Sequence, residues 1–118
     1  MRTPRWAMTS DIGRDYWNDG RSAGCPVIDA HAHMGSWKGI YFPCADHPQM
    51  VERMDRAGVE KVVFSHHAAL SSPDVMNRLS VEGVRAHPER LRAYCVYHPA
   101  YREAAEAELA SLAQFPAV

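Results

Sequence analysis

Two histidines separated by a single residue, His31 and His33, are the side chains whose type and spacing best suit catalysis. They end a short apolar run that starts at Val27 and is typical of a β-strand. Residues two apart on a strand share a face, so both imidazoles are expected to project from the same side as the carboxylate of Asp29. Two imidazoles at one strand end can reach a single divalent ion at about 2.0–2.1 Å, the zinc-to-nitrogen bond length. The spacing therefore predicts a metal site, with Asp29 as a candidate bridging ligand or hydrogen-bond partner.

The same spacing also arises by chance. Seven histidines among 118 residues give roughly 0.4 expected occurrences of such a pair, and the alternative is two structural or solvent-exposed histidines. Here the pair follows an apolar strand start and precedes a regular alternation of strand and helix patterns. That context favours metal ligation.

The segments around the pair alternate between strands and helices. Asp46 stands three residues before Gln49, a capping-box spacing that predicts a helix start, and Gly58 is placed to end that helix with a left-handed cap. Similar signals predict the other elements, which are a strand at 59–65, a helix from Pro73 to the region of Pro88, a strand at 91–97 and a helix from Tyr101 to Gln114. Strand starts recur about every 30 residues, the size of a βαβ unit, which implies a parallel sheet covered by helices.

Each predicted helix has an apolar face that is expected to cover the sheet. These faces comprise Met50, Met54 and Ala57 in the first helix, Val75, Leu79 and Ala86 in the second, and Ala105, Leu109 and Leu112 in the third. Gly83 weakens the second helix by up to about 1 kcal/mol relative to alanine, which a close contact between helix and sheet at that position would explain.

Composition bounds the class of protein. The chain is 47% apolar and 23% charged with a net charge of −1, which argues against disorder and offers no electrostatic footprint for nucleic acid or a membrane surface. Cys25, Cys44 and Cys95 form no C-x-x-C pair, so neither a disulfide framework nor a thiolate zinc site is indicated. No secretory signal or membrane span is visible, and a reducing cytoplasmic setting is expected. Residues 1–24 lack periodicity and are expected to form an irregular extension before one domain over 25–118.

The segment VIDAHAHMG, residues 27–35, resembles the D-x-H-x-H signature that ends the first strand of the amidohydrolase superfamily. The stretches MDRAGVEKVVFS and NRLSVEGVRAHPERLRAYCVYHP are similar to its amidohydrolase-related branch, in which helix one, strand two, helix two and strand three follow in that order. The resemblance covers about residues 25–118. It implies a metal-dependent (β/α)8 TIM barrel with His31 and His33 as ligands of a divalent metal, most simply Zn2+, with Mn2+ or Fe2+ as alternatives.

The function implied by this resemblance is that of a metal-dependent hydrolase, in which metal-activated water attacks an amide, ester or lactone carbonyl. The same branch contains decarboxylases, so a metal-dependent decarboxylase is an alternative. An eight-unit barrel needs about 250 residues, whereas 118 residues hold three βα units. We therefore expect the N-terminal three units of a truncated barrel, without the later strands that supply further ligands and an aspartate in the family. A non-catalytic, metal-binding α/β protein is the third alternative.

Several other side chains are weaker candidates for chemistry. His66, His67 and His98 follow the second and third predicted strands, where one of them could contact substrate or carry a proton, although loop histidines that face solvent are commoner. The loop after the histidine pair contains Trp37, Tyr41 and Phe42, which could wall a pocket, and Lys38, which could pair with a substrate carboxylate. His47 and His87 stand at helix ends, where no catalytic role is expected.

The expected partner is a small-molecule substrate, with no nucleic acid and no membrane. Three parallel strands that close on neither side leave unpaired edges and apolar helix faces. We therefore predict self-association through the open sheet edges and poor stability of the isolated chain. A sharp monomer peak with cooperative thermal unfolding would contradict that prediction.

Overall fold

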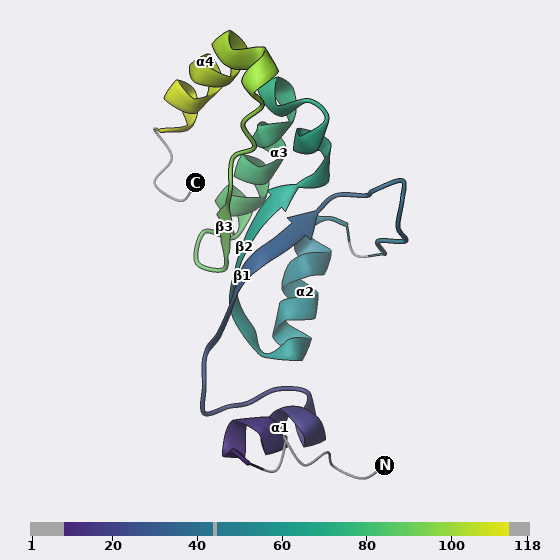
Figure 1. Cartoon of the computed structure of the whole chain (residues 1–118). Helices are drawn as coiled ribbons and strands as arrows, with labels where there is room; N and C mark the ends of the chain where they lie inside the picture. The colour runs from purple at the N-terminus through teal and green to yellow at the C-terminus, as the bar shows by residue number, and fades with distance from the viewer. Residues whose placement is uncertain (1–8, 44, 114–118) are drawn as a thin grey trace.

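The computed structural model describes residues 9–43 and 45–113, so that Cys44 and the two ends of the chain lie outside the described residues (Figure 1). The elements in order are α1 (Asp11–Asp19), β1 (Val27–Met34), α2 (His47–Ala57), β2 (Val59–His66), the 3-10 helix η2 (His67–Leu70), α3 (Pro73–Ala86), β3 (Leu91–Ala93), the 3-10 helix η3 (Pro99–Tyr101) and α4 (Arg102–Leu112).

The chain forms a small α/β domain around a three-stranded parallel sheet in the order β1-β2-β3. The strands alternate with helices, as the sequence patterns predict, and α2 and α3 connect them. The capping prediction for α2 is confirmed: the Asp46 carboxylate accepts from the Gln49 N–H at 2.9 Å, and Gly58 adopts φ 67° at the helix end. The three-strand sheet itself is therefore predictable from local sequence signals.

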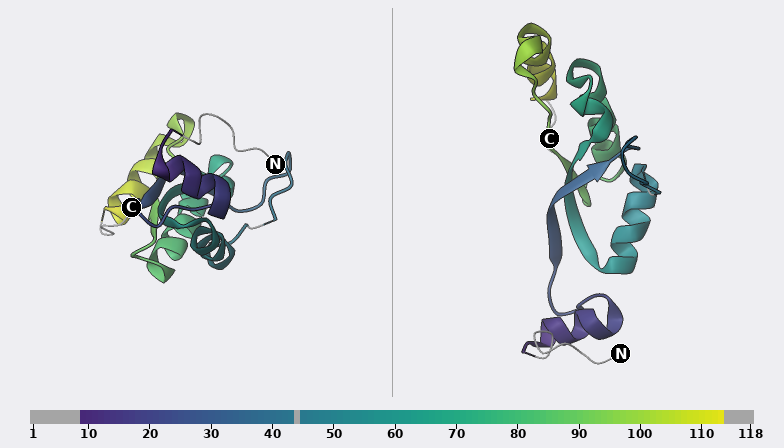
Figure 2. Two further views of the ribbon diagram at one scale, coloured as in Figure 1. Left: turned by 90° about the horizontal axis from the view of Figure 1, so that it is seen from below. Right: turned by 45° about the vertical axis from the view of Figure 1, so that its right-hand side comes forward.

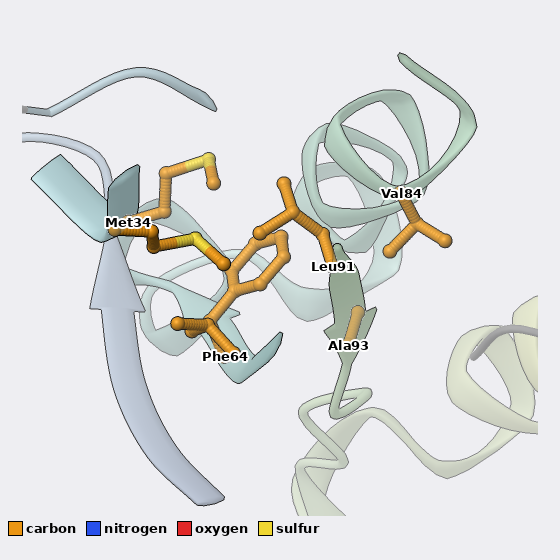
Figure 3. Packing of buried hydrophobic residues seen from close by; sticks show 7 residues of the cluster. Met34, Phe64, Val84, Leu91 and Ala93 are labelled. Carbon is orange, nitrogen blue, oxygen red and sulfur yellow. The ribbon is translucent and has the colours of Figure 1, made fainter. Parts of the chain in front are cut away.

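Both connecting helices pack on one face of the sheet, and this covered face holds the apolar core (Figure 2). Phe64 of β2 is fully buried and its ring lies between Met34 of β1 and Leu91 of β3 (Figure 3). Val62, Ala93, Met54 and Val84 complete the cluster. Burial of these side chains is the main source of stability, at about 25 cal/mol for each Å² of apolar surface removed from water.

Gly83 confirms the predicted close contact between helix and sheet. A Cβ at this position would lie 3.3 Å from Cζ of Phe64, 3.4 Å from Cβ of His47 and 3.6 Å from Cε of Met34. Glycine therefore lets α3 approach the sheet more closely than a larger residue would allow.

No helix covers the opposite face of the sheet in the described chain. We call this surface, formed by the side chains that alternate with the core residues along the strands, the open face. They include Ile28 of β1, 59% exposed, and Tyr94, 50% exposed. The Tyr94 hydroxyl donates to the carbonyl of Ala30 at 3.0 Å, so this ring reaches from the β3 side to β1. Lys61, Val63 and Arg92 share this face, because they alternate with Val62, Phe64 and Leu91 along the strands.

The third strand is shorter than the sequence predicts. β3 covers only Leu91–Ala93 rather than 91–97, because its register with β2 stops at the pair of Phe64 and Ala93 and at the bond from the Tyr94 N–H to the Phe64 carbonyl. The residues beyond Tyr94 therefore pair with no neighbouring strand in the described chain. Asn77 of α3 replaces that neighbour: its amide donates to the Val96 carbonyl at 3.0 Å and accepts from the Val96 N–H at 2.9 Å. A buried helix side chain thus satisfies the backbone that a strand would otherwise pair.

The prediction of an irregular N-terminal extension is wrong for residues 11–19. Ser10 caps α1 by accepting from the Gly13 N–H at 3.0 Å, and Gly20 ends the helix at φ 73°. No residue of α1 is buried, so the helix has no apolar face that packs on the domain. The Ser10 and Gly20 caps are therefore the sequence signal that could have revealed it. Figure 1 shows α1 apart from the sheet.

Two of the predicted helix faces are also partly wrong. Among the α3 residues from 77 onward, the buried positions are Asn77, Ser80, Val81, Gly83 and Val84, whereas Ala86 is exposed. The Val75 side chain lies outside the description. In α4, Ala105 and Leu112 are buried as predicted, but Leu109 is 40% exposed, because α4 packs against α3 and η3 instead of covering the sheet.

The molecule is elongated, with extents of 55 × 31 × 24 Å and a radius of gyration of 17.1 Å. A compact domain of this length has a radius of gyration of about 13–14 Å. None of the helices within the described ranges combines the length and the apolar character needed to cross a membrane.

Candidate functional site

The β1 strand contains an irregularity next to the histidine pair. Asp29 pairs with Val62 and Ala32 with Phe64, so β1 has one residue more than β2 between these two points. The extra residue changes the phase of alternation. Asp29 consequently lines the shallow pocket beside α2 with Ala32 and Met54.

The expectation that Asp29 shares a face with both histidines is therefore wrong. Its carboxylate accepts from the backbone N–H of His31 at 2.9 Å rather than from an imidazole. Asp29 supports the backbone of the bulge, and the structure does not bring it between the two rings.

His31 and His33 do lie together at the carboxyl end of β1, where parallel α/β sheets place their functional groups. Their ring centroids are 5.1 Å apart with planes at 84°. Two imidazoles bound to one ion, each with a nitrogen-to-metal bond of about 2.0–2.1 Å, have centroids roughly 5 Å apart. The separation fits two imidazoles that bind one metal ion. The His31 ring is exposed, so the pair is accessible from solvent.

His33 is oriented by the neighbouring strand. Ser65 is its register partner on β2, and Oγ of Ser65 lies 3.1 Å from Nδ1 of His33. If Nδ1 donates this hydrogen bond, Nε2 carries the lone pair that a metal needs. Burial lowers the pKa of His33, and the nearby His67 and His31 lower it further. The neutral, ligating form of the imidazole is thus favoured at neutral pH.

His31, His33 and His67 form a cluster of neighbouring rings, which we call the histidine cluster. His67 is its buried member, with 6% of its surface exposed. Its ring stacks on that of His33 at 4.8 Å with an interplanar angle of 15°. Nδ1 donates to the carbonyl of Gly35 at 2.6 Å, because a carbonyl oxygen can only accept. In the neutral ring this fixes Nε2 as the nitrogen that can accept a proton.

His66 has a different role. Its ring lies against Gly35, where φ is 85° and a Cβ would collide with the imidazole. Nδ1 accepts from the Ala68 N–H at 3.1 Å and so caps η2. Burial lowers the pKa of His66. The nearby His67 lowers this pKa further, whereas the carboxylate of Glu82 raises it. His66 therefore holds the loop after β1 against the start of η2.

His98 is exposed and caps η3, accepting from the Ala100 N–H at 3.2 Å. The structure gives this histidine a local capping contact and no contact with the His31, His33 and His67 rings. Of the three weaker histidine candidates, only His67 is brought against the predicted metal ligands.

A pocket of about 290 Å³ adjoins the cluster and contains both predicted substrate-binding residues. Its lining consists of Ser36, Trp37, Lys38, His67, Ala68 and Ser71. Trp37 and Phe42 each lie 5.3 Å from the His67 ring between centroids. Tyr41 is 90% exposed, so the expectation that it walls a pocket is wrong.

Two further residues of the site escaped prediction from the sequence. Ser65 and Gly35 position His33 and His67, and Ser65 could have been found by aligning the two predicted strand ends. His47 and His87 also meet, with ring centroids 5.2 Å apart, although they stand at the start of α2 and the end of α3. Their sequence separation gives no signal of this contact.

Within residues 9–43 and 45–113, no group of three or more His, Cys, Asp or Glu side chains is arranged to hold a metal ion. Comparison with protein-family models, with curated proteins and with solved structures gives no match to the chain. The resemblance to the amidohydrolase superfamily stays a prediction.

Proposed function

We propose that the chain belongs to a metal-dependent hydrolase of the amidohydrolase type, with His31 and His33 as ligands of a divalent ion. The observation that carries this proposal is the pair of imidazoles with centroids 5.1 Å apart at the carboxyl end of β1, one of them held by Ser65. Zn2+ is the simplest choice for nitrogen ligands, with Mn2+ or Fe2+ as alternatives.

His31 and His33 would supply only part of the ligands of a catalytic metal site. A catalytic zinc ion usually takes three protein ligands and one open position, and the two histidines would supply two of them. The remaining ligand would have to come from outside the residues described here, either from further strands or from another chain. The proposal therefore includes a larger assembly around the open face.

The residues of this chain would act as follows. Ser65 fixes the His33 ring, and the lowered pKa of His33 keeps its imidazole neutral for binding. His67, whose Nδ1 is held by Gly35, has its other nitrogen free to take up and return a proton during carbonyl attack. A bound divalent ion would supply a water of lowered pKa, near 7, and would polarise the carbonyl.

A (β/α)8 barrel is the architecture that we propose around this site. Two observations support it: all three strands are parallel, and α2 and α3 lie on the same face of the sheet. In a barrel the helices form the outer ring and the opposite face points inward. The open face, with Lys61, Arg92 and Tyr94, would then line the barrel interior.

The two alternatives differ in what the site does. A decarboxylase would use the same two ligands to orient substrate and stabilise developing charge. A non-catalytic metal-binding protein is favoured by the finding that the described residues bring no third ligand to His31 and His33.

Metal binding is tested by the zinc content of the purified chain beside the double variant His31→Ala, His33→Ala. The double variant His47→Ala, His87→Ala is a matched control, since it removes another pair of neighbouring rings at almost the same separation. We expect zinc in the parent and in the control and its loss from the His31, His33 variant. Equal zinc in all three proteins would overturn the proposal.

Turnover separates the hydrolase from the binding protein. Zinc-loaded chain is assayed with a simple aryl ester and a simple lactone. Zinc-dependent hydrolysis that disappears in the His31, His33 variant supports the enzyme. Zinc binding without any turnover would mean that this chain by itself does not complete a catalytic site, as its two ligands imply.

A further inference from the structure

The residues that line the pocket beside the histidine cluster favour binding of an anion. None of the six lining residues is acidic, and one of them, Lys38, is a lysine. Among the residues that the structure describes, no ion pair joins Lys38 to a carboxylate. A cation without a partner beside a cavity favours an anionic ligand.

The pocket also offers flat walls and hydroxyl groups. Trp37 and the buried His67 contribute two aromatic rings with centroids 5.3 Å apart. Ser36 and Ser71 add hydroxyl groups that can donate hydrogen bonds to oxygen atoms. Flat walls suit a planar ligand, and a cation with donors suits a carboxylate.

The turn that carries Lys38 is held in place by several contacts. Trp37 and Ile40 form an isolated antiparallel bridge, and the Ile40 N–H donates to the Trp37 carbonyl at 3.3 Å. The Trp37 indole folds back over the turn, since a Cβ at Gly39 would lie 3.3 Å from its Nε1. The Gly35 carbonyl is bonded to His67 at the other end of the segment. Lys38 is therefore presented from a turn that the histidine cluster itself anchors.

We propose that this pocket binds a small planar carboxylate, with Lys38 pairing with the carboxylate and Trp37 stacking on the planar part. At about 290 Å³ the pocket accommodates a single ring or a short unsaturated acid rather than a large ligand. That this carboxylate is the substrate of the site rests on the proposed function. The binding itself depends on Lys38 and Trp37, neither of which belongs to the proposed metal ligands.

The test uses the full chain without metal, in the presence of EDTA, and titrates benzoate against its neutral isostere benzamide. Binding is followed by 1H–15N NMR at the Trp37 indole and at the backbone amides of Lys38 and Ser71. The chain contains two lysines, so Lys61→Met on the open face is a matched control for Lys38→Met. Methionine keeps most of the aliphatic stem and removes the charge.

We expect saturable shifts at these positions with benzoate and binding of benzamide at least about tenfold weaker, because a charge-assisted bond is lost. Lys38→Met should weaken benzoate to the level of benzamide, and Lys61→Met should leave it unchanged. No shift with benzoate, equal binding of both ligands, or equal effects of the two lysine variants would each overturn the proposal. Since no metal is present, these outcomes do not depend on whether His31 and His33 bind zinc.

Discussion

The two faces of the sheet carry different tasks although they are built from the same strands. Phe64, Leu91 and Ala93 point under α2 and α3 and are almost fully buried, whereas their neighbours Ser65, Arg92 and Tyr94 point to the open face. One face holds apolar side chains that exclude water, and the other presents polar groups and partly exposed rings. The two-residue alternation of β2 and β3 thus separates the buried apolar side chains from the more exposed ones.

The largest expected difference between the faces is in stability. Phe64→Ala removes a ring that is fully buried between β1 and β3 and should cost about 3–5 kcal/mol of unfolding free energy. Tyr94→Ala removes a half-exposed ring and one hydrogen bond and should cost no more than about 1.5 kcal/mol. Urea unfolding followed by circular dichroism measures both. Equal losses would mean that the open face is as tightly packed as the covered one.

A smaller loss is expected where a helix side chain replaces a missing strand neighbour. Asn77→Ala leaves the Val96 N–H and carbonyl without their partner and should cost about 2–3 kcal/mol. Asn18, exposed in α1, is the other asparagine of the chain, and Asn18→Ala should change stability by less than about 0.5 kcal/mol. Similar small effects in both variants would show that the segment after β3 does not depend on Asn77.

The close approach of α3 to the covered face can be tested at Gly83. Alanine gains up to about 1 kcal/mol of helix propensity, but its methyl group presses on Phe64 and His47, and overpacking costs about 1–3 kcal/mol. We expect Gly83→Ala to lower the melting temperature. In a Phe64→Leu background, which removes the ring atom nearest to Gly83, the same change should become neutral or stabilising. A stabilising effect in the parent would contradict the tight contact.

The smallest expected effect is a pH dependence. Burial holds the pKa of His66 below 6.5, so the unfolded chain binds a proton at higher pH than the folded chain does. The contribution is fully present above about pH 6.5 and is lost as the pH falls towards the pKa of the folded state. His66→Asn, which keeps an acceptor for the Ala68 N–H, should flatten this dependence of unfolding free energy on pH. An unchanged slope would exclude His66 as its source.

Local signals were sufficient for most of the fold. The Asp46 and Gln49 capping pair, the left-handed Gly58 and the apolar runs locate α2, β2 and α3 because each depends on residues close in sequence. Gly83 was informative for a different reason: a glycine inside a helix pattern is explained by a close neighbour, although that neighbour lies far away in sequence. β3 was predicted too long, since its length depends on how far it stays paired with β2.

The site was less predictable because it depends on pairing between strands. The bulge that moves Asp29 to the α2 side exists only relative to β2, and no property of β1 alone reveals it. The stacking of His67 on His33 and its bond to Gly35 join residues 32 to 34 positions apart. The sequence therefore supplied the two histidines and Lys38, while the tertiary structure distinguished His67 from His66 and His98.

The central claim, that the carboxyl end of β1 on the open face carries the chemistry, is tested most directly by a long-range 1H–15N NMR spectrum of the seven histidine rings. It is recorded with and without one equivalent of zinc. We predict metal-induced shifts at His31 and His33, with His33 coordinating through Nε2 while Nδ1 keeps its proton towards Ser65. Shifts confined to His47 and His87, or spread evenly over all histidines, would contradict the account.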